Sequence, residues 1–95
     1  MEMPIIKSCD VTECAYNRQN QCHALAITVG DSRAPMCDTF WRMDVKGGDP
    51  AKVGHVGACH MNQCMHNKDL ECQANGGITV GHKAGEPDCM TFKAR

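Results

Sequence analysis

One pattern of cysteines occurs twice in this sequence, and the repetition decides the fold. It reads CDVTECAYNRQNQC at residues 9–22 and CHMNQCMHNKDLEC at residues 59–72. The three cysteines keep their places in both copies, and so does one asparagine, Asn17 or Asn67. Most of the residues between them differ. The conserved spacing therefore indicates that the cysteines are the functional unit of each copy.

The repeat continues beyond the third cysteine. Each copy has an Ile-Thr-Val-Gly block, then a proline, then a fourth cysteine followed by x-Thr-Phe. The cysteine spacings are C-x4-C-x7-C-x14-C and C-x4-C-x7-C-x16-C. Of the 32 residues from Cys9 to Phe40, 13 are identical in the second copy. Identity at this level predicts a duplicated structural unit.

The chain divides around a segment rich in turn-forming residues, Lys46 to Lys52. We predict a first module at 5–45, a linker at 46–54 and a second module at 55–95. A flexible linker would let each module fold without the other. Just before it, Trp41, Met43 and Val45 alternate with polar residues, which predicts a half-buried strand.

Large apolar side chains are scarce. Leu, Ile, Val and Phe together supply 14 of 95 residues, which is below the roughly 20% at which chains struggle to bury enough surface. The formal net charge is only −1, so the chain lacks the high net charge that is typical of disordered proteins. We therefore expect a small, metal-stabilised, irregular β-leaning fold with little hydrophobic core.

Short elements within each module follow from local composition. Residues 17–20 and 67–69 predict hairpin tips between cysteine-bearing arms. Residues 27–29 and 78–80 are β-branched and predict strands. We expect these strands, with Phe40 and Phe92, to form the apolar plug of each module. Thr39 and Thr91 are expected to hydrogen-bond near the last thiolate.

Four thiolates that converge on one point make a closed tetrahedral site, the usual form of structural zinc. We predict two zinc ions, one per module. Histidine is not expected to be a shared ligand, because no histidine has a counterpart in the other copy. The predicted ligands are Cys9, Cys14, Cys22 and Cys37 in the first module, and Cys59, Cys64, Cys72 and Cys89 in the second.

Other uses of the cysteines stay open. Neither copy has the C-x-x-C knuckle of common zinc fingers, and irregular spacing also suits a disulfide framework. An iron–sulfur cluster needs four cysteines too, but the spacing matches neither common ferredoxin pattern. The Cys, Met and His of residues 59–66 are soft ligands for copper(I), yet the first copy has nothing similar.

Several functional classes are disfavoured. Metalloprotease, P-loop and dinucleotide-binding motifs are absent, and a closed four-thiolate site leaves no position for substrate, so we expect no enzyme. Ten basic and 11 acidic residues are dispersed along the chain, which argues against nucleic-acid binding. We expect a protein partner, with Trp41, Tyr16 and Met43 as contacts. Metal storage or sensing is the alternative.

The residues before Cys9 show no basic region followed by an apolar run, so we expect no secretory signal. No stretch approaches the length of a membrane span. Eight cysteines without an export signal are typical of a reducing compartment. The sequence therefore predicts a cytoplasmic protein that does not bind membranes.

The run Cys-x4-Cys-x-Tyr-Asn-x4-Cys-x-Ala-x2-Ile-x-Val-Gly, closed by Cys-x-Thr-Phe, resembles the bacterial domain of unknown function 1540. Cys9 to Phe40 matches it, and Cys59 to Phe92 matches it with His66 at the tyrosine position. The resemblance implies a short cysteine-rich, zinc-binding domain that is often found in tandem in Firmicutes such as clostridia. By motif position it assigns the ligand role to the same eight cysteines.

Overall fold

The structure is a computed structural model of the chain, and it describes residues 3–30, 34–83 and 85–95. These residues form short strands and no helix, as expected for an irregular β-leaning fold. No helix among them is long and apolar enough to span a membrane. The strands are β1 (Ile6–Cys9), β2 (Asn17–Arg18), β3 (Gln21–Cys22), β4 (Ile27–Val29), β5 (Val56–Cys59), β6 (Asn67–Lys68), β7 (Glu71–Cys72), β8 (Ile78–Lys83) and β9 (Glu86–Cys89).

Both predicted hairpins are confirmed. In β2–β3, Asn17 pairs with Cys22, and in β6–β7, Asn67 pairs with Cys72. Each hairpin turns through two consecutive residues with positive φ, a geometry that matches the right-handed twist of the flanking strands. The turn residues are Gln19 (55°), Asn20 (62°), Asp69 (55°) and Leu70 (66°).

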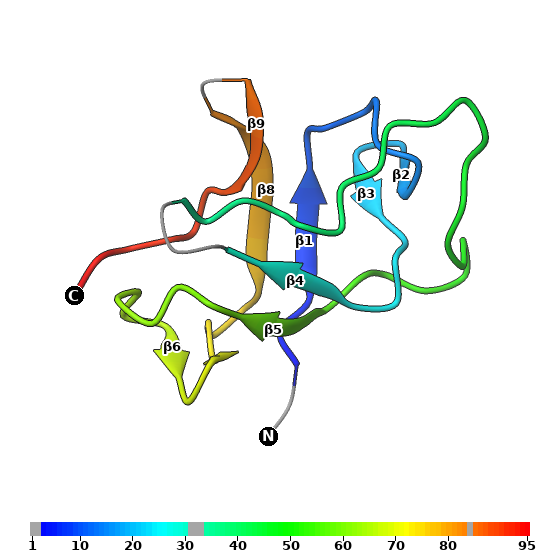
Figure 1. Ribbon diagram of the computed structural model, residues 1–95. Helices are drawn as coiled ribbons and strands as arrows, with labels where there is room; N and C mark the ends of the chain where they lie inside the picture. The colour runs from blue at the N-terminus through cyan, green and yellow to red at the C-terminus, as the bar shows by residue number, and fades with distance from the viewer. Residues whose placement is uncertain (1–2, 31–33, 84) are drawn as a thin grey trace.

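The two repeats exchange their strands. β1 of the first repeat pairs in parallel with β8 of the second, so that Cys9 lies opposite Val80. β5 of the second repeat pairs in parallel with β4 of the first, so that Cys59 lies opposite Val29. Figure 1 shows these two pairs, with β1 beside β8 and β4 beside β5. Each repeat therefore supplies one strand to a sheet that the other repeat completes.

The segment between the repeats follows the surface of the first one closely. The backbone N–H of Asp49 donates to the His23 carbonyl (3.0 Å), and that of Gly54 donates to the Cys22 carbonyl (2.8 Å). Gly48 has φ +85°, and a Cβ there would lie 2.4 Å from the His23 carbonyl oxygen. This segment is held in place, and the strands on either side of it pair across the repeats. The expectation of a flexible linker between two separate modules is therefore wrong, while the module boundaries stay a prediction.

A single buried cluster takes the place of two separate cores. The predicted strand residues Ile27, Val29, Ile78 and Val80 are all at most 4% exposed, and they pack with buried residues of both repeats. Phe40 and Phe92 are only partly buried and lie at the edge of this cluster, so they are not its centre. Seven cysteines lie inside the cluster and Cys89 lies against it.

The segment after Phe40 does not form the predicted half-buried strand. Trp41, Met43 and Val45 are 60%, 54% and 67% exposed. The described backbone there makes one isolated bridge, Arg42 with Cys14, so no neighbouring strand covers the apolar side of the segment. Alternation buries one face only where another layer packs on it.

Replacing Leu70 by Asn is expected to stabilise the protein by about 1 kcal/mol, because asparagine tolerates the left-handed backbone that leucine adopts there. The Leu70 side chain is 50% exposed, so little packing is lost. The matched control is the reverse change in the first hairpin, Asn20→Leu, which should destabilise by a similar amount. Denaturant unfolding measures both, and a Leu70→Asn variant no more stable than the parent would contradict the strain.

Candidate metal centres

The structure gathers the eight predicted ligands into two groups of four. One cavity of about 20 Å³ is lined by the four cysteines of the first repeat, Cys9, Cys14, Cys22 and Cys37. A second cavity of about 20 Å³ is lined by the four cysteines of the second repeat, Cys59, Cys64, Cys72 and Cys89. All eight are free thiols, and seven of them are buried. The grouping within each repeat is the one that the spacing predicts.

Strand ends bring these cysteines together. Cys9 and Cys22 are the last residues of β1 and β3, and Cys59 and Cys72 are the last residues of β5 and β7. The backbone of the fourth cysteine pairs antiparallel with the valine that ends the Ile-Thr-Val run of its own repeat. Cys37 pairs with Val29, and Cys89 pairs with Val80. Each cavity therefore lies beside the ends of the first strand and the hairpin of its own repeat.

Backbone N–H groups point at the sulfur atoms. The N–H of the residue two places after the cysteine lowers the thiol pKa by hydrogen bonding at five positions, Cys9, Cys22, Cys37, Cys72 and Cys89. At a sixth, the N–H of His66 donates to Sγ of Cys64 at 3.5 Å. A hydrogen bond to sulfur favours the thiolate, which is the form that binds metals. The loops around the cysteines therefore favour charged sulfur.

Burial works in the opposite direction. It raises the pKa of the Cys37 thiol to about 12 and that of Cys89 to about 11. Burial likewise raises the pKa of Cys9, Cys22 and Cys72. Neighbouring cysteines of the same group add to each increase, because their charges would repel. At neutral pH these thiols therefore stay protonated unless a cation takes the place of the protons.

Asn17 and Asn67 hold the same position in the two sites, and both are buried. The Asn17 side-chain amide donates to the Cys9 carbonyl (2.8 Å), and its oxygen accepts from the Asn20 N–H (3.2 Å). It also hydrogen-bonds the Cys9 thiol, which lowers the pKa of that thiol. Asn67 repeats the two backbone contacts with Cys59 and Leu70. Sequence reasoning gave these residues no role, although their identity in both copies was the signal.

Thr39 and Thr91 hydrogen-bond beside the last cysteine of each repeat, as predicted, but their hydroxyls bond to the backbone. The Thr39 hydroxyl accepts from the N–H of Thr28 (3.1 Å), and the Thr91 hydroxyl accepts from the N–H of Thr79 (3.0 Å). Each hydroxyl thus ties the last cysteine turn to the Ile-Thr-Val strand of its own repeat. The backbone N–H of each threonine, not its hydroxyl, reaches the thiol.

A sequence profile of the family described as Domain of Unknown Function (DUF1540) matches residues 8–40 and, a second time, residues 58–92. The chain belongs to this family. Two matched segments confirm the tandem repeat of a cysteine-rich domain. No curated protein and no solved structure matches the chain.

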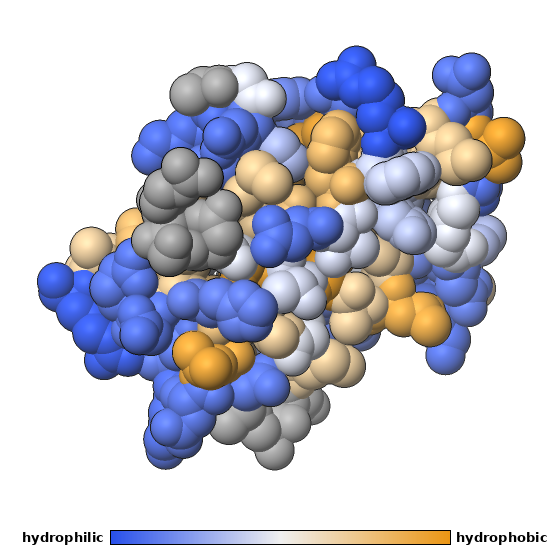
Figure 2. All heavy atoms as spheres, viewed as in Figure 1, coloured by the Kyte–Doolittle hydropathy of each residue, from blue (hydrophilic) through white to orange (hydrophobic). Residues whose placement is uncertain are grey.

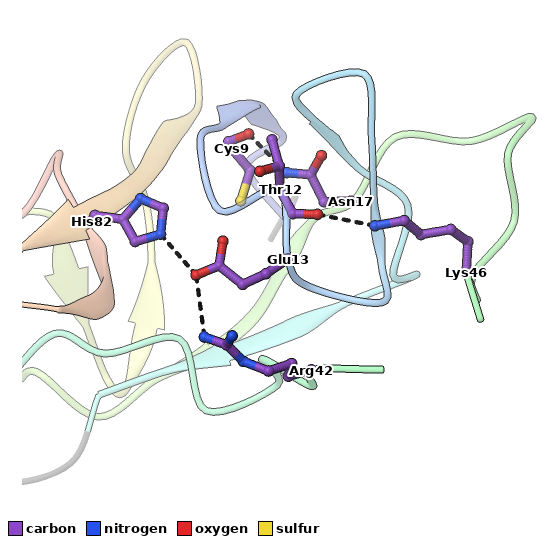
Figure 3. A network of polar contacts seen from close by, with 7 residues as sticks. All are labelled: Cys9, Thr12, Glu13, Asn17, Arg42, Lys46 and His82. Carbon is purple, nitrogen blue, oxygen red and sulfur yellow. Dashed lines mark hydrogen bonds and ion pairs between the residues drawn. The ribbon is translucent and has the colours of Figure 1, made fainter. Parts of the chain in front are cut away.

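The histidines of the two DUF1540 repeats lie in different surroundings. His66 lines the second cavity, where the first has Tyr16. The His23 ring contacts the Lys52 carbonyl (2.8 Å). His82 contacts a carboxylate oxygen of Glu13 at 2.9 Å, and Arg42 approaches the same carboxylate, as Figure 3 shows. His66 alone among these three lines a cysteine cavity.

The cavities fit one small guest each. A volume of about 20 Å³ is close to the space that a single water molecule needs. In residues 3–30, 34–83 and 85–95, no three His, Cys, Asp or Glu side chains are already arranged to hold a metal ion. The thiols share a cavity wall, and they must close in on it to bind an ion. The donor set and the N–H groups that face it suit a thiophilic cation.

Replacing Asn17 by Ala is expected to lower stability by about 1–3 kcal/mol, because the Cys9 carbonyl and the Asn20 N–H lose their partner inside the protein. Asn67→Ala should have the same effect in the second site. Asn75→Ala is the matched control, because that side chain is exposed. Thermal or denaturant unfolding compares the three, and equal losses for Asn17 and Asn75 would show that the buried amide has no structural role.

Proposed function

We propose that this protein binds two zinc ions, one on the four cysteines of each repeat, and that the ions are structural. The observation that supports this most directly is the pair of cavities, each lined by all four cysteines of one repeat. Zinc is the metal that most often occupies four-thiolate sites with a structural role. The backbone N–H groups aimed at sulfur suit such a site, because they stabilise charged ligands.

Basic side chains near both sites support the charge balance of this proposal. Four thiolates around one Zn²⁺ carry a net negative charge. The Lys46 ammonium donates to the carbonyls of Thr12 and Cys14, both at 3.0 Å, and Figure 3 shows its contact with Thr12. In the second repeat the Arg95 guanidinium donates to the Asn62 carbonyl (3.4 Å), which corresponds to the Thr12 carbonyl, and to the Asn67 carbonyl. A cation close to each cluster would offset part of its charge.

A structural role follows from where the cysteines lie. They form part of the one buried cluster and lie at the ends of several strands, so a metal ion bound there would cross-link those strand ends. Structural zinc sites contribute roughly 10–16 kcal/mol of apparent binding free energy, and much of it appears as folding stability. Four thiolates leave no open position for a substrate, so we propose that the protein is not an enzyme.

We further propose that the zinc-held fold presents a surface to a protein partner. Trp41, Met43 and Val45 lie exposed in one segment that follows directly on the first site. Tyr16, the third contact suggested by the sequence, is half-buried and lines the first cavity, so it is the weakest candidate. On the face in Figure 2, apolar residues form small groups among polar ones.

Metal storage or sensing is the second candidate, and Cys89 is the observation that favours it. Of the eight cysteines it alone is only partly buried. An accessible ligand gives a competing chelator a place to attack, so the second site would exchange zinc faster than the first.

Native mass spectrometry of protein purified under reducing conditions tests the zinc proposal. We expect two zinc ions per chain, and denaturation with a chelator should release them and leave eight thiols open to alkylation. His23→Ala and His60→Ala should keep both ions, because neither side chain lines either cysteine cavity. A metal-free mass reduced by two hydrogens per cysteine pair would overturn the proposal in favour of disulfides.

Zinc affinity is expected to rise steeply with pH between 6 and 8. Burial holds the pKa of five of these thiols above the usual range, up to about 12 at Cys37, so protons compete with zinc over this whole interval. Each ion should displace up to about four protons at pH 7. Calorimetry in buffers of different ionisation enthalpy counts these protons. Affinity that does not change with pH would show that the ligands are not these thiols.

A further inference from the structure

We propose that the two metal centres are coupled through the exchanged strands, so that the protein takes up its two zinc ions together. This inference rests on the zinc proposal above and goes beyond it. It identifies the proline segments around Pro35 and Pro87 as positioning elements, each acting on the site of the other repeat. The contacts that carry it occur in matching pairs on the two sides of the molecule.

The fourth cysteine of each site is held by the other repeat. The backbone N–H of Cys37 donates to the Pro87 carbonyl at 2.6 Å. The backbone N–H of Cys89 donates to the Pro35 carbonyl at 2.7 Å. Each proline lies two residues before the fourth cysteine of its own repeat, so the two fourth cysteines are held reciprocally. Neither last ligand is therefore positioned by its own repeat alone.

The first cysteine of each site is held in the same reciprocal way. Directly after Cys9, the N–H of Asp10 donates to the Val80 carbonyl (2.9 Å). Directly after Cys59, the N–H of His60 donates to the Val29 carbonyl (2.8 Å). These bonds extend the parallel pairs β1–β8 and β4–β5 up to the ligands.

The cavity walls show the same exchange. Val80 and Pro87 of the second repeat line the first cavity, and Val29 and Pro35 of the first repeat line the second. Each site thus has its four thiols from one repeat and part of its wall from the other. A repeat without its neighbour would lack both the wall and two of the backbone bonds that place its ligands.

Positive coupling follows from this arrangement. The first ion to bind must order strands of both repeats, because its own site is incomplete otherwise. The second ion then finds its ligands already placed and meets a smaller ordering cost. Coupling between sites is typically worth a factor of about 5–150 in affinity.

The first test counts ions at half-saturation. Reduced, metal-free protein is equilibrated with one zinc per chain through a weak chelator, and native mass spectrometry measures the chains with zero, one and two ions. Independent equal sites leave about half of the chains with one ion. Tenfold coupling lowers this share to about a quarter, which is the upper limit we expect. A one-ion share of half or more overturns the coupling.

Two glycines of the second repeat give a matched pair of variants. Gly77 (φ +95°) and Gly76 (φ +88°) carry the same backbone strain when changed to Ala. A Cβ at Gly77 would lie 2.6 Å from the Ile5 carbonyl oxygen, which accepts from Ile78 where β8 meets β1. A Cβ at Gly76 meets nothing within 4 Å. Only Gly77→Ala therefore forces the two repeats apart.

We expect Gly77→Ala to raise the one-ion share toward half, while Gly76→Ala keeps the parent distribution. Identical distributions for the two variants would contradict coupling through β1 and β8. Circular dichroism with excess zinc checks that each variant folds. If Gly77→Ala does not fold while Gly76→Ala does, the repeats depend on each other as proposed.

Cys14→Ser supplies a measurement that does not rely on the glycines. It removes one ligand of the first site and touches none of the second, so we expect the remaining zinc to bind at least tenfold more weakly than in the parent. Unchanged affinity at the intact site would overturn the coupling and leave the zinc proposal standing. A parent protein that binds no zinc would instead overturn the zinc proposal itself.

Discussion

A shortage of large apolar residues constrains this protein more than any other property. Fourteen Leu, Ile, Val and Phe residues cannot fill two separate cores, and the structure builds one. It does so by pairing β1 with β8 and β4 with β5, which places the Ile and Val side chains of both repeats in the same cluster. The exchange of strands is thus a solution to a packing problem. As a consequence of this pairing, the walls of each cysteine cavity come from both repeats.

The cysteines have two roles within that cluster. As small, buried side chains they complete the core, and as ligands they would cross-link it. These roles conflict electrostatically, because burial disfavours thiolates. Backbone N–H groups two residues beyond most of the cysteines, and the buried amide of Asn17, partly offset this effect by lowering the thiol pKa through hydrogen bonds. A metal ion would resolve what remains of the conflict, since it replaces the protons that burial retains.

The repeats share a backbone plan but differ at individual positions. Tyr16 at the first cavity corresponds to His66 at the second, and the buried Val11 corresponds to the buried Met61. Gly30 accommodates this methionine, because a Cβ there would lie 2.6 Å from its Cγ. Together with the partial exposure of Cys89, these differences give the two cavities unlike walls. The copies have diverged around the cavities while keeping all four cysteines of each.

The sequence by itself determined the local features: the two hairpins, the Ile-Thr-Val strands and the grouping of four cysteines per repeat. These features depend mainly on residues close together in the chain, such as Asn17 and the cysteines on either side of it. The partner of each strand was decided only in the tertiary structure. The two Ile-Thr-Val runs are identical, so pattern alone cannot tell whether Cys9 pairs beside Val29 or beside Val80. Burying one continuous core favours the pairing of Cys9 beside Val80, and neither composition nor periodicity predicts that choice.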